Sequence, residues 1–377
     1  MSIRFTQPTL TGKELDNIRE AMQKGRLMGN GEFTRRCQAW LEQTLGCRKA
    51  LLTHSCTAAL EMGAILSNAG PGDEVIMPSF TFVSTANAFV LRGATPVFVD
   101  VDPVNLNMPP EAVAAAVTKK TKAIAPVHYA GVPCRMDEIV EIAQGCKATV
   151  VEDAAQSLLS TYKGRHAGTF GQLAAISFHE TKNVVSGEGG ALVINDPALV
   201  ERAEIVWEKG TNRSKFFRGE VDKYTWVDVG SSFLPSELVA AFLLAQLDSS
   251  RELTASRLVL WDRYQEKLQP LFKEGLLQGP HIPKDVVHNA HIYFVLTRSA
   301  DEARRLLAAM KEKGIGAVHH YVPLHSAPAG RRYGRTHGSL KNTEALADRL
   351  VRLPMWSDLT PAMQDEVVAL VFHFFSR

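Results

Sequence analysis

Residues 148–156 read ATVVEDAAQ, and residues 174–183 read AAISFHETKN. Each stretch opens with small and branched apolar residues, which is typical of a strand buried on both faces. Each then ends in charged or polar residues, with Asp153 following the first strand and Lys182 following the second. Ligands of α/β proteins bind beyond the carboxyl ends of such strands. These two stretches therefore indicate both the fold class and the place of its site.

The same alternation of strand and helix extends from about residue 50 to residue 195. Predicted strands cover 73–78, 95–99, 123–127, 148–151, 174–178 and 191–194. Predicted helices between them cover 58–67, 85–92, 110–119 and 136–144. Apolar strands that alternate with helices are typical of a mainly parallel sheet covered on both faces. The sequence thus predicts an α/β fold.

The pattern of expected helices and strands changes near residue 250. Before it, 236–246 reads as an apolar helix, and 248–268 continues as an amphipathic helix that Pro270 is expected to end. After it, the expected elements are a strand at 291–297, a helix at 301–313 and a histidine-rich segment at 319–325. We therefore expect a large domain over residues 1–250 and a smaller α+β domain over residues 251–377.

The composition is that of an ordinary soluble protein of 377 residues, with 45% hydrophobic and 22% charged residues. The formal net charge of +2 gives no reason to expect a nucleic-acid partner. No apolar run is long enough to span a bilayer, and residues 1–7 (MSIRFTQ) lack the apolar core of a signal peptide. The five cysteines form no CxxC pair, so neither disulfides nor a metal site is expected. A cytoplasmic location follows as an expectation.

Lys182 and Asp153 carry the first chemical hypothesis. A partly buried lysine has a lowered pKa and can attack a carbonyl to form a Schiff base. A carboxylate at a strand end needs a partner if it is desolvated, and the protonated pyridine nitrogen of pyridoxal phosphate (PLP) is such a partner. Taken alone, Lys182 could equally be a surface lysine, and Asp153 could be a helix N-cap.

Two further features strengthen the PLP hypothesis. Ser55, Cys56 and Thr57 open a helix, where hydroxyl and free N–H groups form a natural phosphate site, although such residues are also common caps. Phe82 follows another strand end and could stack on a flat cofactor, although aromatic residues there are more often part of the core. The joint order of these features along the chain indicates a PLP site.

Across almost its whole length the chain resembles the sugar-aminotransferase family of fold-type I PLP enzymes (the DegT/DnrJ/EryC/StrS type). The matching segments are PGDEVIMPSFTFVSTANA, PVFVDVD, PVHYAG, VVEDAAQS, SFHETKN and GEGG. The resemblance implies a mainly parallel, seven-stranded-type sheet in the large domain. Some relatives have histidine in place of the Schiff-base lysine and are dehydratases, whereas this chain has Lys182.

The resemblance also implies roles for individual residues. Lys182 and Asp153 would be the catalytic pair, and Gln156 would lie near the phenolic oxygen of the cofactor. The remaining implied cofactor contacts are Ser55, Cys56, Thr57, Phe82, Ser177 and Ser232, and the implied substrate contacts are His320, Tyr321 and His325. His128 and Tyr129 follow a strand on the same edge without an assigned role. Ser232 stands where many relatives have an asparagine that reaches the neighbouring subunit's cofactor.

The implied reaction is transfer of an amino group from glutamate to a nucleotide-linked 4-keto-6-deoxy sugar. Segments such as KGTNRSKFFRGEVDKYTW and DVGSSFL imply dTDP-4-keto-6-deoxyglucose as that sugar, dTDP-4-amino-4,6-dideoxygalactose as product and enterobacterial surface polysaccharide as destination. A homodimer with active sites at its interface is also implied. Alternatives are another keto-sugar nucleotide or amination at C3, a non-catalytic PLP-binding regulator, and a dinucleotide-dependent oxidoreductase, which the absence of a GxGxxG motif disfavours.

Overall fold

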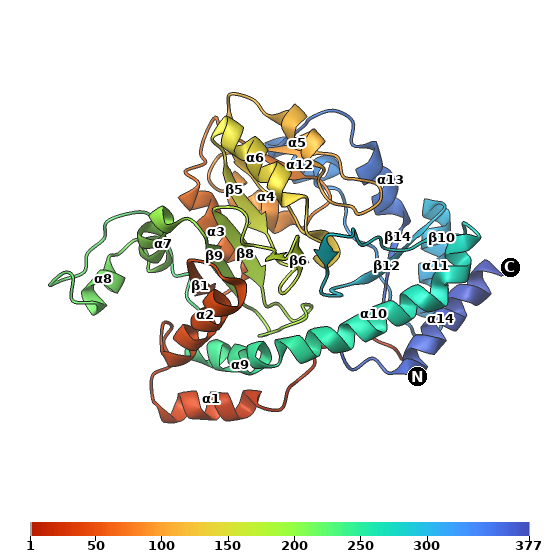
Figure 1. Ribbon diagram of the computed structural model, residues 1–377, viewed down its shortest axis with the longest axis horizontal. Coiled ribbons are helices and arrows are strands. Elements are labelled where there is room, and N and C mark those ends of the chain that lie inside the picture. The colour runs from red at the N-terminus through yellow and green to blue at the C-terminus, as the bar shows by residue number, and fades with distance from the viewer. Residues whose placement is uncertain (1, 377) are drawn as a thin grey trace.

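The computed structural model describes residues 2–376 and is built around an eight-stranded sheet (Figure 1). In spatial order its strands are β1 (Lys49–Thr53), β9 (Gly190–Ile194), β8 (Leu173–Ser177), β5 (Thr149–Asp153), β4 (Thr121–Ile124), β2 (Glu74–Pro78), β3 (Thr95–Val99) and β13 (Arg335–Thr336). The six strands predicted from the sequence are all present within a few residues of their expected bounds. The mainly parallel α/β fold is thus confirmed, and β13 adds a two-residue strand at one edge.

Strand direction brings several loops to one edge of this sheet. Strands β8, β5, β4, β2 and β3 run parallel, whereas β9 is antiparallel to both β8 and β1. The carboxyl ends of β5, β8 and β1 therefore meet at the same edge as the start of β9. Gly190 at the start of β9 pairs with Ser177 on one side and Thr53 on the other. This edge carries the candidate site.

Helices cover both faces of the sheet because successive strand residues point to opposite sides and nearly all of them are apolar. One face packs on α3 (Cys56–Leu66), α4 (Val83–Val90) and α7 (Val200–Trp207). The other face packs on α5 (Pro110–Ala116), α6 (Met136–Cys146), α2 (Glu32–Leu45) and α9 (Glu237–Asp248).

A second core lies towards the C-terminus. A three-stranded antiparallel sheet in the order β10 (Leu277–Gln278), β12 (Tyr293–Thr297) and β14 (Leu350–Leu353) packs with α10 (Ser250–Lys273), α11 (Ala300–Glu312), α13 (Lys341–Arg349) and α14 (Pro361–Phe375). Figure 1 shows α10 running from the large sheet to this second core. The division at residue 250 stays a prediction, since β13 returns to the large sheet and β11 (Val286–Val287) pairs with β6 (Thr161–Tyr162).

Pro270 does not end α10, so that prediction was wrong. The helix continues through Pro270 to Lys273. A proline within a helix removes one backbone hydrogen bond and disfavours the turn before it. Here Leu268 and Leu271 on either side are buried in the second core, and the Glu274 N–H still donates to the Pro270 carbonyl. Burial of these two leucines offsets the local cost.

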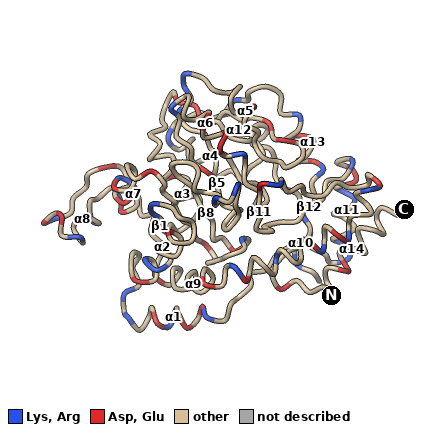
Figure 2. Tube along the Cα trace, in the orientation of Figure 1, with Lys and Arg blue, Asp and Glu red and all other residues tan. Residues whose placement is uncertain are grey.

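Shorter elements complete the described chain: α1 (Glu14–Gln23), β7 (Arg165–His166), α8 (Arg213–Phe217), α12 (Pro328–Tyr333) and the 3₁₀ turns η1 (Tyr129–Gly131), η2 (Pro197–Leu199) and η3 (Leu324–Ser326). In Figure 1 the segment around α8 projects away from the body. Figure 2 shows basic and acidic residues interspersed along the trace, in keeping with the small net charge. Within residues 2–376, no helix combines the length and apolarity that crossing a membrane requires.

Candidate active site

The start of α3 offers an anion site at the edge of the sheet. Ser55 is the N-cap and its Oγ accepts the Ala58 N–H at 3.1 Å. Among residues 2–376 the N–H groups of Cys56 and Thr57 have no acceptor, as expected for the first turn of a helix. Gly190 packs so closely here that a Cβ would lie 2.5 Å from the Cys56 nitrogen. The pair of free N–H groups fits a phosphate.

Asp153 ends β5 as a buried carboxylate with two hydrogen-bond donors and no cation. The Thr85 hydroxyl donates to its Oδ2 at 2.6 Å, and the Ala155 N–H donates to its Oδ1 at 3.1 Å. The side chain forms no ion pair within residues 2–376, although a buried charge ordinarily needs a partner. A protonated ring nitrogen would supply it, so Asp153 fits the cofactor role expected from the sequence.

Lys182 lies in a tight turn after β8. Backbone hydrogen bonds hold this turn, for example from the Lys182 N–H to the His179 carbonyl and from the Glu180 N–H to the Gly187 carbonyl. Burial lowers the pKa of the Lys182 amine, and the positive charge of Arg352 acts in the same direction, whereas Asp153 opposes it. A lysine with a lowered pKa has more of the neutral amine that attacks a carbonyl.

The structure joins Gln156 and Tyr321 across the two cores. Gln156 Oε1 accepts the Ala130 N–H at 2.8 Å, and its Nε2 donates to the Tyr321 hydroxyl at 2.9 Å. The Phe82 ring lies 6.4 Å from the Tyr321 ring and is 56% exposed, which leaves a face free for stacking. Since Nε2 carries a second hydrogen, Gln156 can also donate to a cofactor oxygen.

His320 joins this cluster, whereas His325 and Ser232 do not. His320 Nδ1 lies 3.1 Å from the Tyr129 hydroxyl, and burial lowers the pKa of its imidazole. His325 is held by other partners, with Nδ1 2.7 Å from the Ser79 hydroxyl and Nε2 3.1 Å from Glu344. Ser232 is exposed, and its backbone forms an isolated β-bridge with Glu208 at the end of α7. Ser232 therefore lies apart from the cluster formed by Gln156, Tyr321 and His320, and the described chain shows no contact between them.

Ser177 and the Thr57 hydroxyl lie at the same edge of the sheet. Ser177 is buried at the end of β8, where its Oγ accepts the His179 N–H. The Thr57 hydroxyl contacts that of Ser84 at 2.7 Å. These hydroxyls border the free N–H groups of α3, as expected for a phosphate site.

Sequence reasoning missed Thr85, which contacts Asp153 directly. Thr81 extends the chain of hydroxyls, since its Oγ1 lies 2.9 Å from that of Thr85. Thr81 lies two positions before α4 and Thr85 lies in the first turn of that helix, four positions later in the sequence. That spacing was the available signal, but only the fold shows that Thr85 meets the end of β5.

The lowered pKa of Lys182 predicts a pH-dependent stability difference. In the unfolded chain the amine returns to its ordinary value near 10.5 and binds a proton that the folded state holds less well. This penalty is present at neutral pH and disappears as pH rises through 10.5. We expect cofactor-free Lys182→Met to melt at a higher temperature than the cofactor-free parent at pH 7, with the gap narrowing towards pH 10. A gap that is absent at pH 7 or widens with pH would contradict the prediction.

Comparison with known proteins places the chain in a family. The DegT/DnrJ/EryC1/StrS aminotransferase family matches residues 8–372. The chain is 32% identical over 375 residues to the spore coat polysaccharide biosynthesis protein SpsC of Bacillus subtilis, covering 97% of this chain and 95% of that protein. The crystal structure of the aminotransferase TlmJ from Streptoalloteichus hindustanus superposes with a TM-score of 0.92 at 30% identity, covering 100% of this chain and 99% of that one.

A further similar structure is the putative sugar aminotransferase Spr1654 of Streptococcus pneumoniae, solved in PLP and PMP forms. Its PLP form has a TM-score of 0.91 at 24% identity, covering 100% of this chain and 99% of that one. The buried Asp153, the Lys182 amine with its lowered pKa and the free N–H groups of α3 fit the PLP cofactor expected from the sequence. The chain belongs to the DegT/DnrJ/EryC1/StrS aminotransferase family, which is PLP-dependent.

Proposed function

We propose that the chain transfers the amino group of glutamate to C4 of dTDP-4-keto-6-deoxyglucose, which yields dTDP-4-amino-4,6-dideoxygalactose. The observation that carries the reaction type is the convergence of three features at one sheet edge. These are the Lys182 amine with its lowered pKa, the buried carboxylate of Asp153 and the free N–H groups of α3. Together they match the aldehyde, ring nitrogen and phosphate of PLP.

Each residue has a definite task in this proposal. PLP, when bound, supplies an electron sink that makes the Cα proton of the amino donor acidic. Lys182 Nζ takes that proton and returns it as general base and acid, while Asp153 holds a proton at the ring nitrogen. The Thr85 hydroxyl donates to the Asp153 carboxylate and keeps it oriented. Gln156 Nε2, which donates one hydrogen to the Tyr321 hydroxyl, would donate its other hydrogen to the phenolic oxygen of PLP. The N–H groups of Cys56 and Thr57 bind the phosphate.

The substrate assignment rests on the segments 209–226 and 228–234, which resemble enzymes making this amino sugar for enterobacterial surface polysaccharide. In the structure these segments form one arm that includes α8. The Trp226 side chain on this arm is 78% exposed to solvent. We propose that this arm covers the neighbouring subunit of a homodimer and that Ser232 there approaches the neighbour's cofactor phosphate. An exposed tryptophan on a projecting arm supports burial against a partner.

The nucleotide end of the sugar would lie beside His320 and Tyr321. Both residues line a cleft of about 690 Å³, which also includes Arg304 and His319. Clefts of this size hold ligands as large as a nucleotide sugar. His325 contacts Ser79 and Glu344 and would hold the segment 319–325 in place. The relation to a spore coat polysaccharide protein supports a role in cell-surface polysaccharide, such as lipopolysaccharide or enterobacterial common antigen, with synthesis in the cytoplasm.

A comparison of amination rates with different keto-sugars tests the proposed substrate. The purified protein with PLP and glutamate is incubated separately with dTDP-4-keto-6-deoxyglucose, its 3-keto isomer and the UDP-linked 4-keto sugar. We expect amination of the first substrate at least about 10-fold faster than of the others, with the new amine at C4 shown by mass and NMR analysis. Preferential amination of the 3-keto isomer would overturn the position, and preference for UDP would overturn the nucleotide. Lys182→Ala is the negative control.

A further inference from the structure

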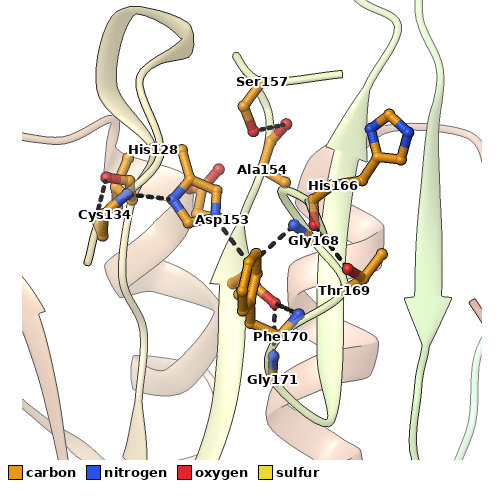
Figure 3. A network of polar contacts seen from close by, with 12 residues as sticks. His128, Cys134, Asp153, Ala154, Ser157, His166, Gly168, Thr169, Phe170 and Gly171 are labelled. Carbon is orange, nitrogen blue, oxygen red and sulfur yellow. Dashed lines mark hydrogen bonds and ion pairs between the residues drawn. The ribbon is translucent and has the colours of Figure 1, made fainter. Parts of the chain in front are cut away.

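Glu152, which directly precedes Asp153, is a fully buried carboxylate that accepts four hydrogen bonds. Figure 3 labels the residues that supply the four donors, which are His128, Gly168, Phe170 and Gly171. Its Oε1 accepts the N–H groups of Phe170 and Gly171 at 2.7 and 2.6 Å. Its Oε2 accepts the Gly168 N–H and lies 2.8 Å from His128 Nε2. Four donors saturate the carboxylate, which compensates for its loss of water.

His128 is held in one tautomer by its second nitrogen. The Cys134 N–H donates to His128 Nδ1 at 3.2 Å, so Nδ1 must carry a lone pair. The ring proton therefore lies on Nε2 and is donated to Glu152. His128 Nε2 is in this geometry a fixed donor to Glu152, and the contacts with Cys134 and Glu152 raise the pKa of the buried imidazole.

The same loop also holds the backbone of Asp153. The His128 N–H donates to the Asp153 carbonyl at 3.1 Å, and the Asp153 N–H donates to the Pro126 carbonyl at 2.8 Å. Neighbouring residues of a strand point to opposite faces. Glu152 therefore ties β5 to its loops on the side away from the site, while Asp153 faces the site.

The turn that supplies three of the four donors has no room to shift. At Gly171 a Cβ would lie 2.6 Å from Val150 Cγ1 and 2.7 Å from the Val150 carbonyl oxygen. The turn is thus packed against β5 as closely as glycine allows. A change in the bonding of Glu152 would consequently move the end of β5, and Asp153 with it.

We propose that Glu152 and His128 are positioning residues for Asp153, fixing where its carboxylate meets the ring nitrogen of PLP. The proposal rests on the role of Asp153 given above. Neither residue touches the cofactor, so both act through the end of β5. In metal sites, loss of a contact that supports a ligand typically lowers activity about 10- to 100-fold, and we expect an effect of this order here.

Two substitutions of His128 form a matched pair. In His128→Gln the side-chain amide can reach the place of Nε2 and still donate to Glu152. In His128→Asn it can reach only the place of Nδ1, so it keeps an acceptor for the Cys134 N–H but leaves Glu152 without its fourth donor. Glu152→Gln is a third variant, in which an NH₂ group faces N–H donors.

The readouts are the absorption maximum and circular dichroism of the PLP band, the PLP dissociation constant and the single-turnover rate with glutamate. We expect His128→Asn and Glu152→Gln to shift the band and slow the rate about 10- to 100-fold, with His128→Gln retaining most of both. If Glu152→Gln does not fold, the comparison of His128→Gln with His128→Asn still tests the proposal. Equal behaviour of the two histidine variants would overturn the proposal.

Asp153→Asn separates this proposal from the one on which it rests. If Asp153→Asn leaves band and rate unchanged, the role of Asp153 fails and the positioning proposal falls with it. If Asp153→Asn alters both while His128→Asn matches the parent, only the positioning proposal fails. Expected instead is a graded series, in which Asp153→Asn has the largest effect and His128→Asn a smaller effect on the same band.

Discussion

Lys182→Ala is expected to lower turnover at least about 10⁴-fold while the protein still folds. Positioned proton transfer alone is worth about 10²- to 10⁴-fold, and the variant also loses the covalent hold on PLP. The fold should survive because the turn is held by backbone bonds, including those from the Phe178 N–H to the Gly189 carbonyl and from the Ser186 N–H to the Phe178 carbonyl. Turnover with glutamate and the visible PLP band measure the loss.

The matched control for this variant is Lys119→Ala, at an exposed lysine that follows α5. It should keep the parent's rate and visible band. Far-ultraviolet circular dichroism should be the same for the parent and both variants. Turnover in Lys182→Ala within about 10²-fold of the parent, the smallest loss expected for positioned proton transfer, would refute the assignment of Lys182.

Asp153→Asn should slow the half-reaction with glutamate about 10²- to 10³-fold, the usual loss for one preorganised electrostatic partner. Asparagine keeps the size of the side chain and the hydrogen bond from Thr85, but it lacks the charge that holds a proton at the ring nitrogen. PLP should still bind, because Lys182 and the free N–H groups of α3 are unchanged. Single-turnover kinetics after mixing with glutamate measure the effect.

Thr85→Val provides a graded comparison for Asp153→Asn. It removes one hydrogen bond to the carboxylate, an interaction worth about 1.5–3 kcal/mol, but leaves the charge in place. Its rate should therefore lie between those of the parent and Asp153→Asn. A Thr85→Val variant slower than Asp153→Asn would show that the hydroxyl, and not the charge, dominates.

The sequence was most informative where strands are buried on both faces. Runs such as 96–99 and 191–194 are apolar throughout, so the strands that contain them were predicted within a residue at each end. It was least informative at the N-terminal side, where α1, α2 and β1 were not predicted. The apolar residues of α1 and α2 are spaced among charged ones, and only the packing of these helices on α9 makes their role plain. The apolar run of β1 covers three residues, 50–52, which is short for a strand prediction.

The site shows the same contrast. Lys182 and Asp153 could be predicted because each follows a predicted strand that ends at one edge of the sheet. The start of α3 could be predicted because Ser55 and Thr57 are residue types that open helices. Contacts between distant segments could not be predicted, since nothing local pairs Gln156 with Tyr321 or Glu152 with His128. Pro270 failed as a helix stop for the same reason, because tertiary burial outweighed the local preference.

The visible absorption spectrum of the purified, PLP-reconstituted protein tests the central claim most directly. The account predicts a yellow band from the cofactor bound to Lys182, which bleaches when glutamate is added without any sugar and returns when a keto-sugar acceptor follows. A band that ignores glutamate would contradict glutamate as the donor. The absence of any band would contradict the assignment of Lys182 and the reaction built on it.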